Sequence, residues 1–166
     1  EDMISIIYKD AGAYYSNVNN VNLYGFNINI QKRFTDFLGK KIDLNSVYSY
    51  TDGESNNQQI IEGMSKHAFN LRVKYSIFKK LDLLMTQKYN SSKTVFVFGS
   101  SETKLLEPFT IVDALLVFQF NRISIKGGVK NIFNYLDPNG NNQDSKELLT
   151  TIDPGRRLYF NIKFSL

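Results

Sequence analysis

The stretch L-Y-F-N-I-K-F-S-L, residues 158–166, decides the fold of this chain. Every second residue in it is apolar, and polar or amphipathic residues stand between them. Successive side chains of a β-strand point to opposite faces, so this alternation predicts a strand with one apolar face and one polar face. We expect the apolar face of this closing strand to comprise Leu158, Phe160, Ile162, Phe164 and Leu166.

The same alternation recurs upstream and predicts about eight antiparallel strands in all. Clear examples are expected at 22–31, 42–51, 67–77, 81–89, 112–120 and 123–130, after a first strand at 4–8. No period of 3.6 residues predicts a helix. Residues 94–98 are strand-like, and the pattern leaves open whether they extend the strand before them or form a hairpin within a loop.

The connections between the predicted strands alternate in length. Those expected at 9–20, 52–66, 90–108 and 134–155 are long, whereas those at 35–40, 78–80 and 121–122 are short. In an up-and-down meander, alternate connections lie at the same end of the sheet. All long loops are therefore expected at one end and all tight turns at the other, which is the asymmetry of outer-membrane barrels.

Composition excludes several classes of protein. The 166 residues include no cysteine, so a disulfide framework and a cysteine-based metal site are excluded. The net charge is +4, and no run of lysine or arginine indicates a nucleic-acid partner. No apolar stretch reaches the roughly 18 residues of a transmembrane helix, and the mean hydropathy is -0.29. A helical membrane protein is therefore not expected.

Two classes of all-β fold compete for this pattern: a soluble sandwich or lipocalin-like barrel, and a transmembrane β-barrel. Long strands, a second face rich in charged residues, and aromatic residues at the strand ends all favour the membrane. A lysine or arginine that faces lipid at the bilayer midplane costs roughly 2–4 kcal/mol. The clear strands carry no such charge in mid-strand on the apolar face. Lys32 is the nearest exception, and it lies close enough to a turn to extend toward the interface.

The charged residues of the polar face are predicted to face the barrel lumen. They are Asp43, Arg72, Lys74, Asp82, Asp113, Lys126, Lys130 and Lys163. We expect them to be solvated or ion-paired, with ion selectivity along a pore as the alternative. Tyr14 and Tyr15 are candidate ligand contacts in an outer loop, with packing or an interfacial girdle as the alternative.

No stretch predicts catalytic chemistry. The sequence contains no nucleophile elbow, phosphate-binding loop or metal-ligand spacing, and the single histidine, His67, is expected at the boundary of a strand. We therefore expect neither an enzyme nor a cofactor.

Three blocks carry a family resemblance. Gly128–Asn134 reads G-V-K-N-I-F-N, residues 154–166 begin P-G-R, and Tyr15–Val18 (Y-S-N-V) precedes Tyr24–Phe26 (Y-G-F). Together they resemble the C-terminal end of TonB-dependent outer-membrane receptors, in the style of those from Bacteroidetes. Two positions depart from the family pattern. Asn27 stands where many members have glutamate. Leu166 stands where members usually have an aromatic residue that the barrel-assembly machinery recognises, and Phe164 is the nearest residue that could serve instead.

The resemblance implies a bacterial outer-membrane barrel of 22 strands around an N-terminal plug domain. Such receptors take up siderophores, haem, cobalamin or glycans, energised by TonB through the plug region. The implied partners are outer-membrane lipid, the remaining strands and plug (of the same receptor or of another chain), TonB acting through the plug region and, as a further candidate, a surface lipoprotein. Residues 1–166 would then be one barrel segment without a plug, the last strands of the barrel. Since the chain begins at Glu1, a signal peptide or a longer upstream region is expected to be missing.

The alternative is a self-contained eight-stranded outer-membrane barrel with a structural, adhesion or binding role. The two hypotheses differ in one observable contact. A self-contained barrel requires the closing strand to pair with the strand at 4–8, whereas a receptor segment leaves that edge for other strands.

Overall fold

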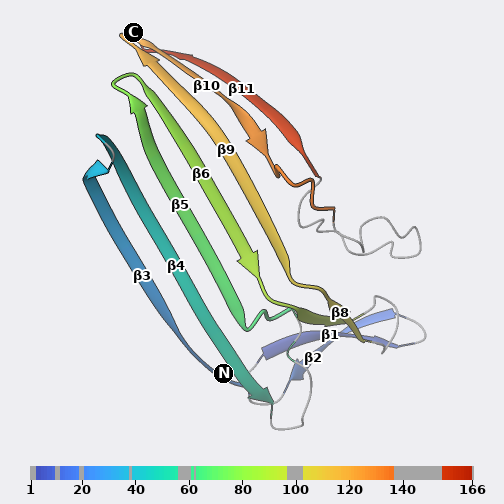
Figure 1. The fold of residues 1–166 in the computed structure, drawn as a ribbon. Coiled ribbons are helices and arrows are strands. Elements are labelled where there is room, and N and C mark those ends of the chain that lie inside the picture. Colours follow the sequence, from blue (N-terminus) through green and yellow to red (C-terminus); the bar gives the residue numbers. More distant parts are fainter. Residues whose placement is uncertain are drawn as a thin grey trace.

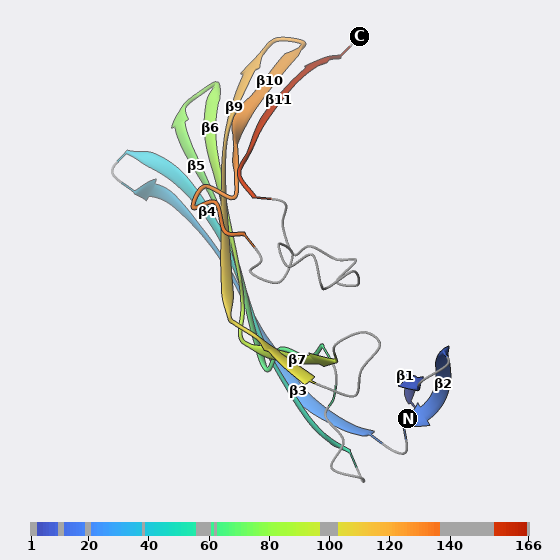
Figure 2. The same cartoon turned by 90° about the vertical axis from the view of Figure 1, so that its right-hand side faces the viewer.

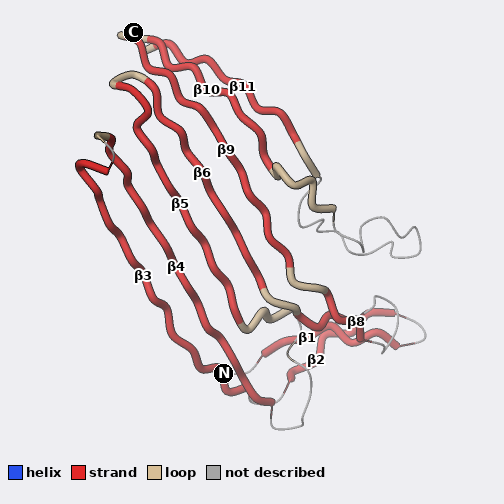
Figure 3. The backbone as a smooth tube through the Cα atoms, viewed as in Figure 1, coloured by secondary structure: helices blue, strands red, loops and turns tan. Residues whose placement is uncertain are grey.

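A computed structural model describes residues 3–9, 12–18, 21–37, 39–55, 61, 63–96, 103–136 and 155–165. In this part of the chain the regular elements are all β-strands (Figure 3). Their bounds are β1 Met3–Lys9, β2 Gly12–Val18, β3 Val21–Phe37, β4 Lys40–Ser55, β5 His67–Phe78, β6 Leu81–Asn90, β7 Lys93–Phe96, β8 Thr103–Leu106, β9 Phe109–Phe120, β10 Ile123–Lys130 and β11 Arg157–Phe164.

Seven of these strands form one antiparallel sheet in the order β11-β10-β9-β6-β5-β4-β3. Figure 1 shows them side by side, and Figure 2 shows that the sheet is strongly curved. The hairpins β1-β2 and β7-β8 are separate two-stranded sheets. The predicted all-β, antiparallel meander is therefore confirmed. Among the described residues, no helix is both long and apolar enough to cross a membrane.

The strand register keeps apolar side chains opposite apolar side chains across the whole sheet. One row joins six strands through successive cross-strand pairs: Leu44, Val73, Met85, Ala114, Val129 and Leu158. We call the face that carries this row the apolar face. Since the side chains of a strand alternate between the two faces, the opposite or polar face carries their neighbours, such as Lys74 beside Val73.

The two ends of the sheet differ as the alternating connections predict. The turns β3-β4, β5-β6 and β9-β10 lie together at the upper end in Figure 1, while the longer connections leave from the other end. Gly39, with a φ of 72°, and Asn121, with a φ of 50°, supply the left-handed backbone that two of these tight turns need. We refer to the two ends as the short-turn end and the long-connection end.

Two sequence predictions need correction. Residues 9–20 were expected to be a loop, but Gly12–Val18 forms β2 and pairs with β1. The first strand therefore joins this small hairpin and not the main sheet. The expected loop at 52–66 also begins later, because β4 continues to Ser55. The open question at 94–98 is settled: Lys93–Phe96 pairs with Thr103–Leu106 as a separate hairpin.

The closing strand β11 pairs with β10, and the structure describes no strand on its other edge. The eight-stranded barrel required a pair between β11 and the strand at 4–8, and these two strands lie in different sheets. Closure of that kind is absent from the described residues. The edge strand at the other side, β3, is exposed along nearly its whole length.

Two adjacent glycines in β10 provide a test of this packing. A Cβ on Gly128 would lie 2.2 Å from the carbonyl oxygen of Ala114, whereas a Cβ on Gly127 would meet no atom closer than 3.7 Å. We expect Gly128→Ala to lower the free energy of unfolding by about 1–3 kcal/mol, because the backbone of β9 must move. The full-length protein would be titrated with urea and the folded fraction measured from its heat-modifiable mobility on gels.

Gly127→Ala is the matched control, with an expected change within about 0.5 kcal/mol. Equal stability of the two variants would contradict the close approach of β9 and β10 at Gly128.

Candidate functional site

The apolar face is exposed on the edge strands β3 and β11 and half-buried on much of the strands between them. On β11, Leu158 is 87% exposed and Phe160 is 69% exposed, and Ile162 and Phe164 share their face. The predicted apolar side of the closing strand thus lies on the apolar face, except for Leu166, which is outside the described residues. Among those residues only Val21, Leu106, Phe109 and Val117 are buried hydrophobic side chains. A surface of this size needs an apolar neighbour to cover it.

At the long-connection end, aromatic side chains gather on the apolar face. The ring of Tyr50 lies 5.6 Å from that of Phe26 and 5.3 Å from that of His67, measured between centroids. The hydroxyl of Tyr48 is hydrogen-bonded to Nδ1 of His67 over 2.8 Å. The predicted boundary position of His67, at the first residue of β5, therefore places it in an aromatic girdle.

An ion pair lies beside this girdle. Lys66 Nζ is 2.8 Å from Asp52 Oδ2, and the Tyr50 hydroxyl donates to the same oxygen over 3.0 Å. The backbone N–H of Gly53 donates to the other carboxylate oxygen. The hydrogen bond to Asp52 raises the pKa of Lys66 and so favours its charged form. The charge of Lys66 is therefore paired locally.

All eight charged residues predicted to face the lumen share the polar face. The register joins them in rows, of which one runs Asn45, Arg72, Thr86 and Asp113, and another Ser76, Asp82, Val117 and Lys126. Lys163 lies opposite Ser124, and Lys130 opposite Arg157. The structure thus brings the predicted set to one surface. That this surface lines a lumen remains a prediction.

Cross-strand ion pairs link the first strands of the polar face. Lys74 Nζ is 3.1 Å from Asp82 Oδ2, and the Ser76 hydroxyl donates to the other oxygen of Asp82 over 2.8 Å. Arg33 donates through Nε to Asp43 on the neighbouring strand. Arg33 was not among the residues predicted to face the lumen, although it shares the polar parity of Gln31.

Two lysines of the polar face, on β6 and β10, lie over aromatic rings. Lys88 Nζ lies 6.0 Å from the centroid of Phe109, and Lys130 Nζ lies 5.5 Å from that of Tyr159. These rings hold the lysine side chains against the sheet. The charged residues of the polar face are thus distributed over several strands. Among the described residues, no three acidic, histidine or cysteine side chains lie close enough together to hold a metal ion.

Tyr14 and Tyr15, the candidate ligand contacts, lie in β2 opposite Ile7 and Ile6. Their side chains are outside the described part of the structure, so their proposed contact with a ligand remains a prediction.

Sequence reasoning missed the structural role of Asn131. Its side chain is fully buried, and its backbone φ is 52°. The side-chain Oδ1 accepts from the N–H of Tyr135 over 2.8 Å, and Nδ2 donates to the Tyr135 carbonyl over 2.7 Å. Its own N–H donates to Asp113 Oδ1 over 2.8 Å. Asn131 therefore closes the turn that ends β10 and occupies one oxygen of Asp113.

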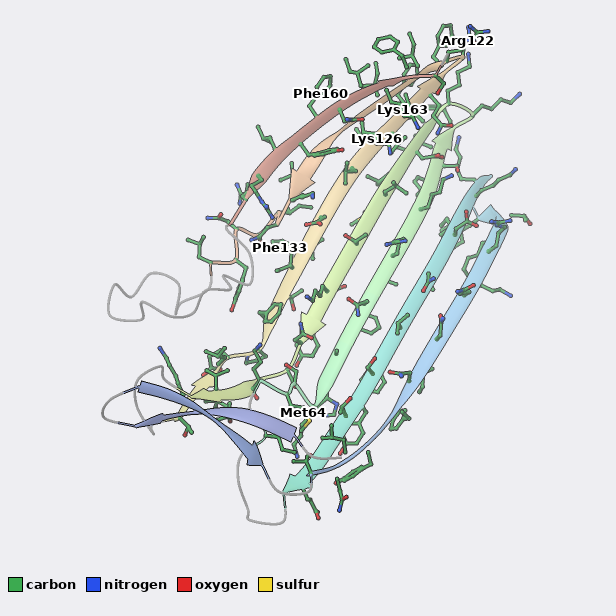
Figure 4. All side chains as sticks on the ribbon, turned by 180° about the vertical axis from the view of Figure 1, so that it is seen from behind. Met64, Arg122, Lys126, Phe133, Phe160 and Lys163 are labelled. Atoms are coloured by element: carbon green, nitrogen blue, oxygen red, sulfur yellow. The ribbon has the colours of Figure 1, made fainter. Side chains whose placement is uncertain are left out.

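The second asparagine of this segment connects two sequence blocks. The side-chain Oδ1 of Asn134 accepts from the N–H of Arg156 over 2.9 Å. The segment G-V-K-N-I-F-N is thereby tied to the P-G-R that precedes β11, although 22 positions separate the two residues. Figure 4 shows Phe133 at this junction, beyond the end of β10. These polar residues are structural, and their pattern gives no ligand site.

Comparison with known proteins agrees with this two-faced sheet. The family model described as TonB dependent receptor-like, beta-barrel matches residues 1–132. The chain belongs to this family of β-barrel receptors. No curated protein matches it. The family comprises bacterial outer-membrane receptors and transporters with a plug that interacts with TonB, and it is not a family of enzymes.

The Asn131 turn yields a second prediction. Asn131→Ala removes both side-chain hydrogen bonds and leaves a residue with a Cβ atom at a positive φ. We therefore expect the free energy of unfolding to fall by about 2–4 kcal/mol. Asn131→Gly relieves the backbone strain and should fall between Asn131→Ala and the parent protein. Urea titration of the full-length protein measures all three.

Asn29→Ala, on exposed β3, is the matched control and should change stability by less than about 0.5 kcal/mol. If Asn131→Ala were as stable as this control, the turn would not depend on the buried amide.

Proposed function

We propose that residues 1–166 are a single barrel segment, the last strands of a TonB-dependent receptor that imports a scarce nutrient. The observation that carries the proposal is the curved seven-stranded sheet, apolar on one face and charged on the other. Lipid covers the apolar face, and the polar face lines the lumen around a plug. The family match supports the receptor class.

The sheet edges support a larger barrel. The N–H and C=O groups of an open edge cannot be satisfied by hydrocarbon, so both β3 and β11 require further strands inside a membrane. We infer that these come from the same receptor, completing a barrel of about 22 strands. TonB acts through the plug region, and a surface lipoprotein is a further candidate partner at the long-connection end.

The charges of the polar face suit this role. Arg33 with Asp43, and Lys74 with Asp82, give a hydrated wall with local charge balance on its first strands. Such a wall can face a plug without long-range repulsion. Siderophores, haem, cobalamin and glycans are the ligand classes open to it, and the choice among them depends on the plug and the outer loops.

Site-directed labelling tests which face meets lipid. The printed sequence has no cysteine, so single cysteines can be introduced without background from this segment. Ile162→Cys lies on the apolar face, and Asn161→Cys, its neighbour, lies on the polar face. Each would be labelled with bimane in the full-length protein and reconstituted into vesicles that contain brominated lipid.

We expect bimane at position 162 to be quenched several-fold more strongly than at position 161, because bromine atoms reach only the lipid-facing side. Ile125→Cys and Lys126→Cys form a second pair of opposite faces on β10. Equal quenching within both pairs, or the reverse order, would overturn the assignment of the faces.

A further inference from the structure

The short-turn end carries a concentration of positive charge. The stretches 34–41, 78–81 and 119–124 contain five cationic residues: Lys40, Lys41, Lys79, Lys80 and Arg122. Their one acidic residue is Asp36, whose side chain is outside the described part of the structure. The nearest other carboxylates, Asp43 and Asp82, are bonded to cations of the polar face. Charge at this end is therefore not balanced by described neighbours.

Lysine ammonium groups lie over phenylalanine rings along this end. Lys40 Nζ of the β3-β4 turn lies 5.1 Å from the ring centroid of Phe78, at the end of β5. Lys80 Nζ of the β5-β6 turn lies 4.3 Å from that of Phe120, at the end of β9. Each lysine thus extends from one hairpin to the aromatic ring of the next. Lys32 repeats the contact within β3, 5.9 Å from the ring centroid of Phe34.

These contacts hold the ammonium groups next to the rings of Phe78 and Phe120, at the short-turn end of the sheet. Phe78 is 64% exposed and Phe120 is 45% exposed, so each ring presents apolar surface as well as a face to its lysine. An ammonium over a ring still has N–H donors that point away from it. The arrangement places apolar rings and hydrogen-bond donors next to each other, as at the boundary between acyl chains and headgroups.

Arg122 extends the same row. The backbone N–H of Gln119 donates to the carbonyl of Lys80 over 2.8 Å, and that of Ser165 donates to the carbonyl of Arg122 over 2.8 Å. The last two turns and the end of β11 are therefore joined through the backbone. Figure 4 shows Arg122 at this end of the molecule, far from Met64 at the other.

The long-connection end offers a contrast. There Lys66 is bound by Asp52, and the aromatic cluster consists of tyrosines and His67 as well as phenylalanine. Lys66 is thus ion-paired at that end, where Lys130 and Arg157 also lie opposite each other, whereas the short-turn end holds its lysines over phenylalanine rings. The two ends therefore differ in the side chains that lie beside their cations.

We propose that the short-turn rim, defined as Lys40, Lys80 and Arg122 with Phe78 and Phe120, binds the headgroups of anionic phospholipids. Because strands about 4.8 Å apart separate the three turns, each cation donates to the phosphate of the lipid that faces its own turn, and the glycerol and first acyl carbons of these lipids pack on the two rings. Arginine and lysine near a membrane surface attract anionic lipid in this way. The inference rests on the membrane insertion proposed above.

Native mass spectrometry of the full-length protein tests this site. Lipid-free protein in detergent would be titrated with dioleoylphosphatidylglycerol, and with dioleoylphosphatidylcholine as the zwitterionic reference. The rim variant K40Q/K80Q/R122Q should lose about tenfold or more in its preference for phosphatidylglycerol. The matched control K88Q/K126Q/K163Q removes three positive charges from the polar face and should keep that preference.

The charge-conserving variant K40R/K80R/R122K should also keep the preference, which separates loss of charge from loss of fold. An equal loss in the rim and control variants would overturn the proposal, because binding would then follow net charge alone. Displacement of the lipid by millimolar inorganic phosphate would overturn it too, since the rim would then be a free-anion site. Failure of the membrane assignment would be visible separately, as recovery of the protein in the soluble fraction of cells before any lipid is added.

Discussion

The constraint on which the structure depends is the register between neighbouring strands. Because side chains alternate with a period of two, a slip of one residue in any strand would exchange its two faces. Val73 lies opposite Leu44 and Met85, and such a slip would bring Lys74 or Arg72 to the apolar face instead. In a bilayer that exchange costs roughly 2–4 kcal/mol for each lysine or arginine near the midplane. The contrast between the two environments therefore selects the register as strongly as the backbone ladder does.

The same register explains why ion pairs occur where they do. Asp43 lies between Arg33 and Lys74 on adjacent strands, so opposite charges meet across the ladder without any local sequence signal. Asp82 lies opposite Ser76 and reaches Lys74, two residues along the same strand, as its ion-pair partner. Exposed pairs of this kind contribute little to stability in water. In the observed register Asp43 faces a cation on each side, which is compatible with the register that the apolar face requires.

Period-two alternation was sufficient to predict the seven strands of the main sheet and both of its faces. It failed for Gly12–Val18, where tyrosine, serine and asparagine fall on both parities and define no face. The four-residue strands β7 and β8 are too short for any period to be decisive. The role of Asn131 was also hidden, because it depends on a positive φ and on a carbonyl four residues away. Lys40 and Phe78 are far apart in sequence, and only the order of the hairpins shows that they meet.

The open edges and the exposed apolar face make different physical demands. A soluble sheet protects its edge strands with charge, short length or irregular backbone. The closing strand β11 has none of these on its apolar side, where Leu158 and Phe160 are among the most exposed side chains of the described residues. Lipid can cover this face, because acyl chains need no hydrogen bonds. It cannot satisfy the free N–H and C=O groups of the strand edge, so only another strand can do so. A sheet of this kind is therefore stable in a bilayer only as part of a closed barrel, and the strands that close it must supply the partners that β1 does not.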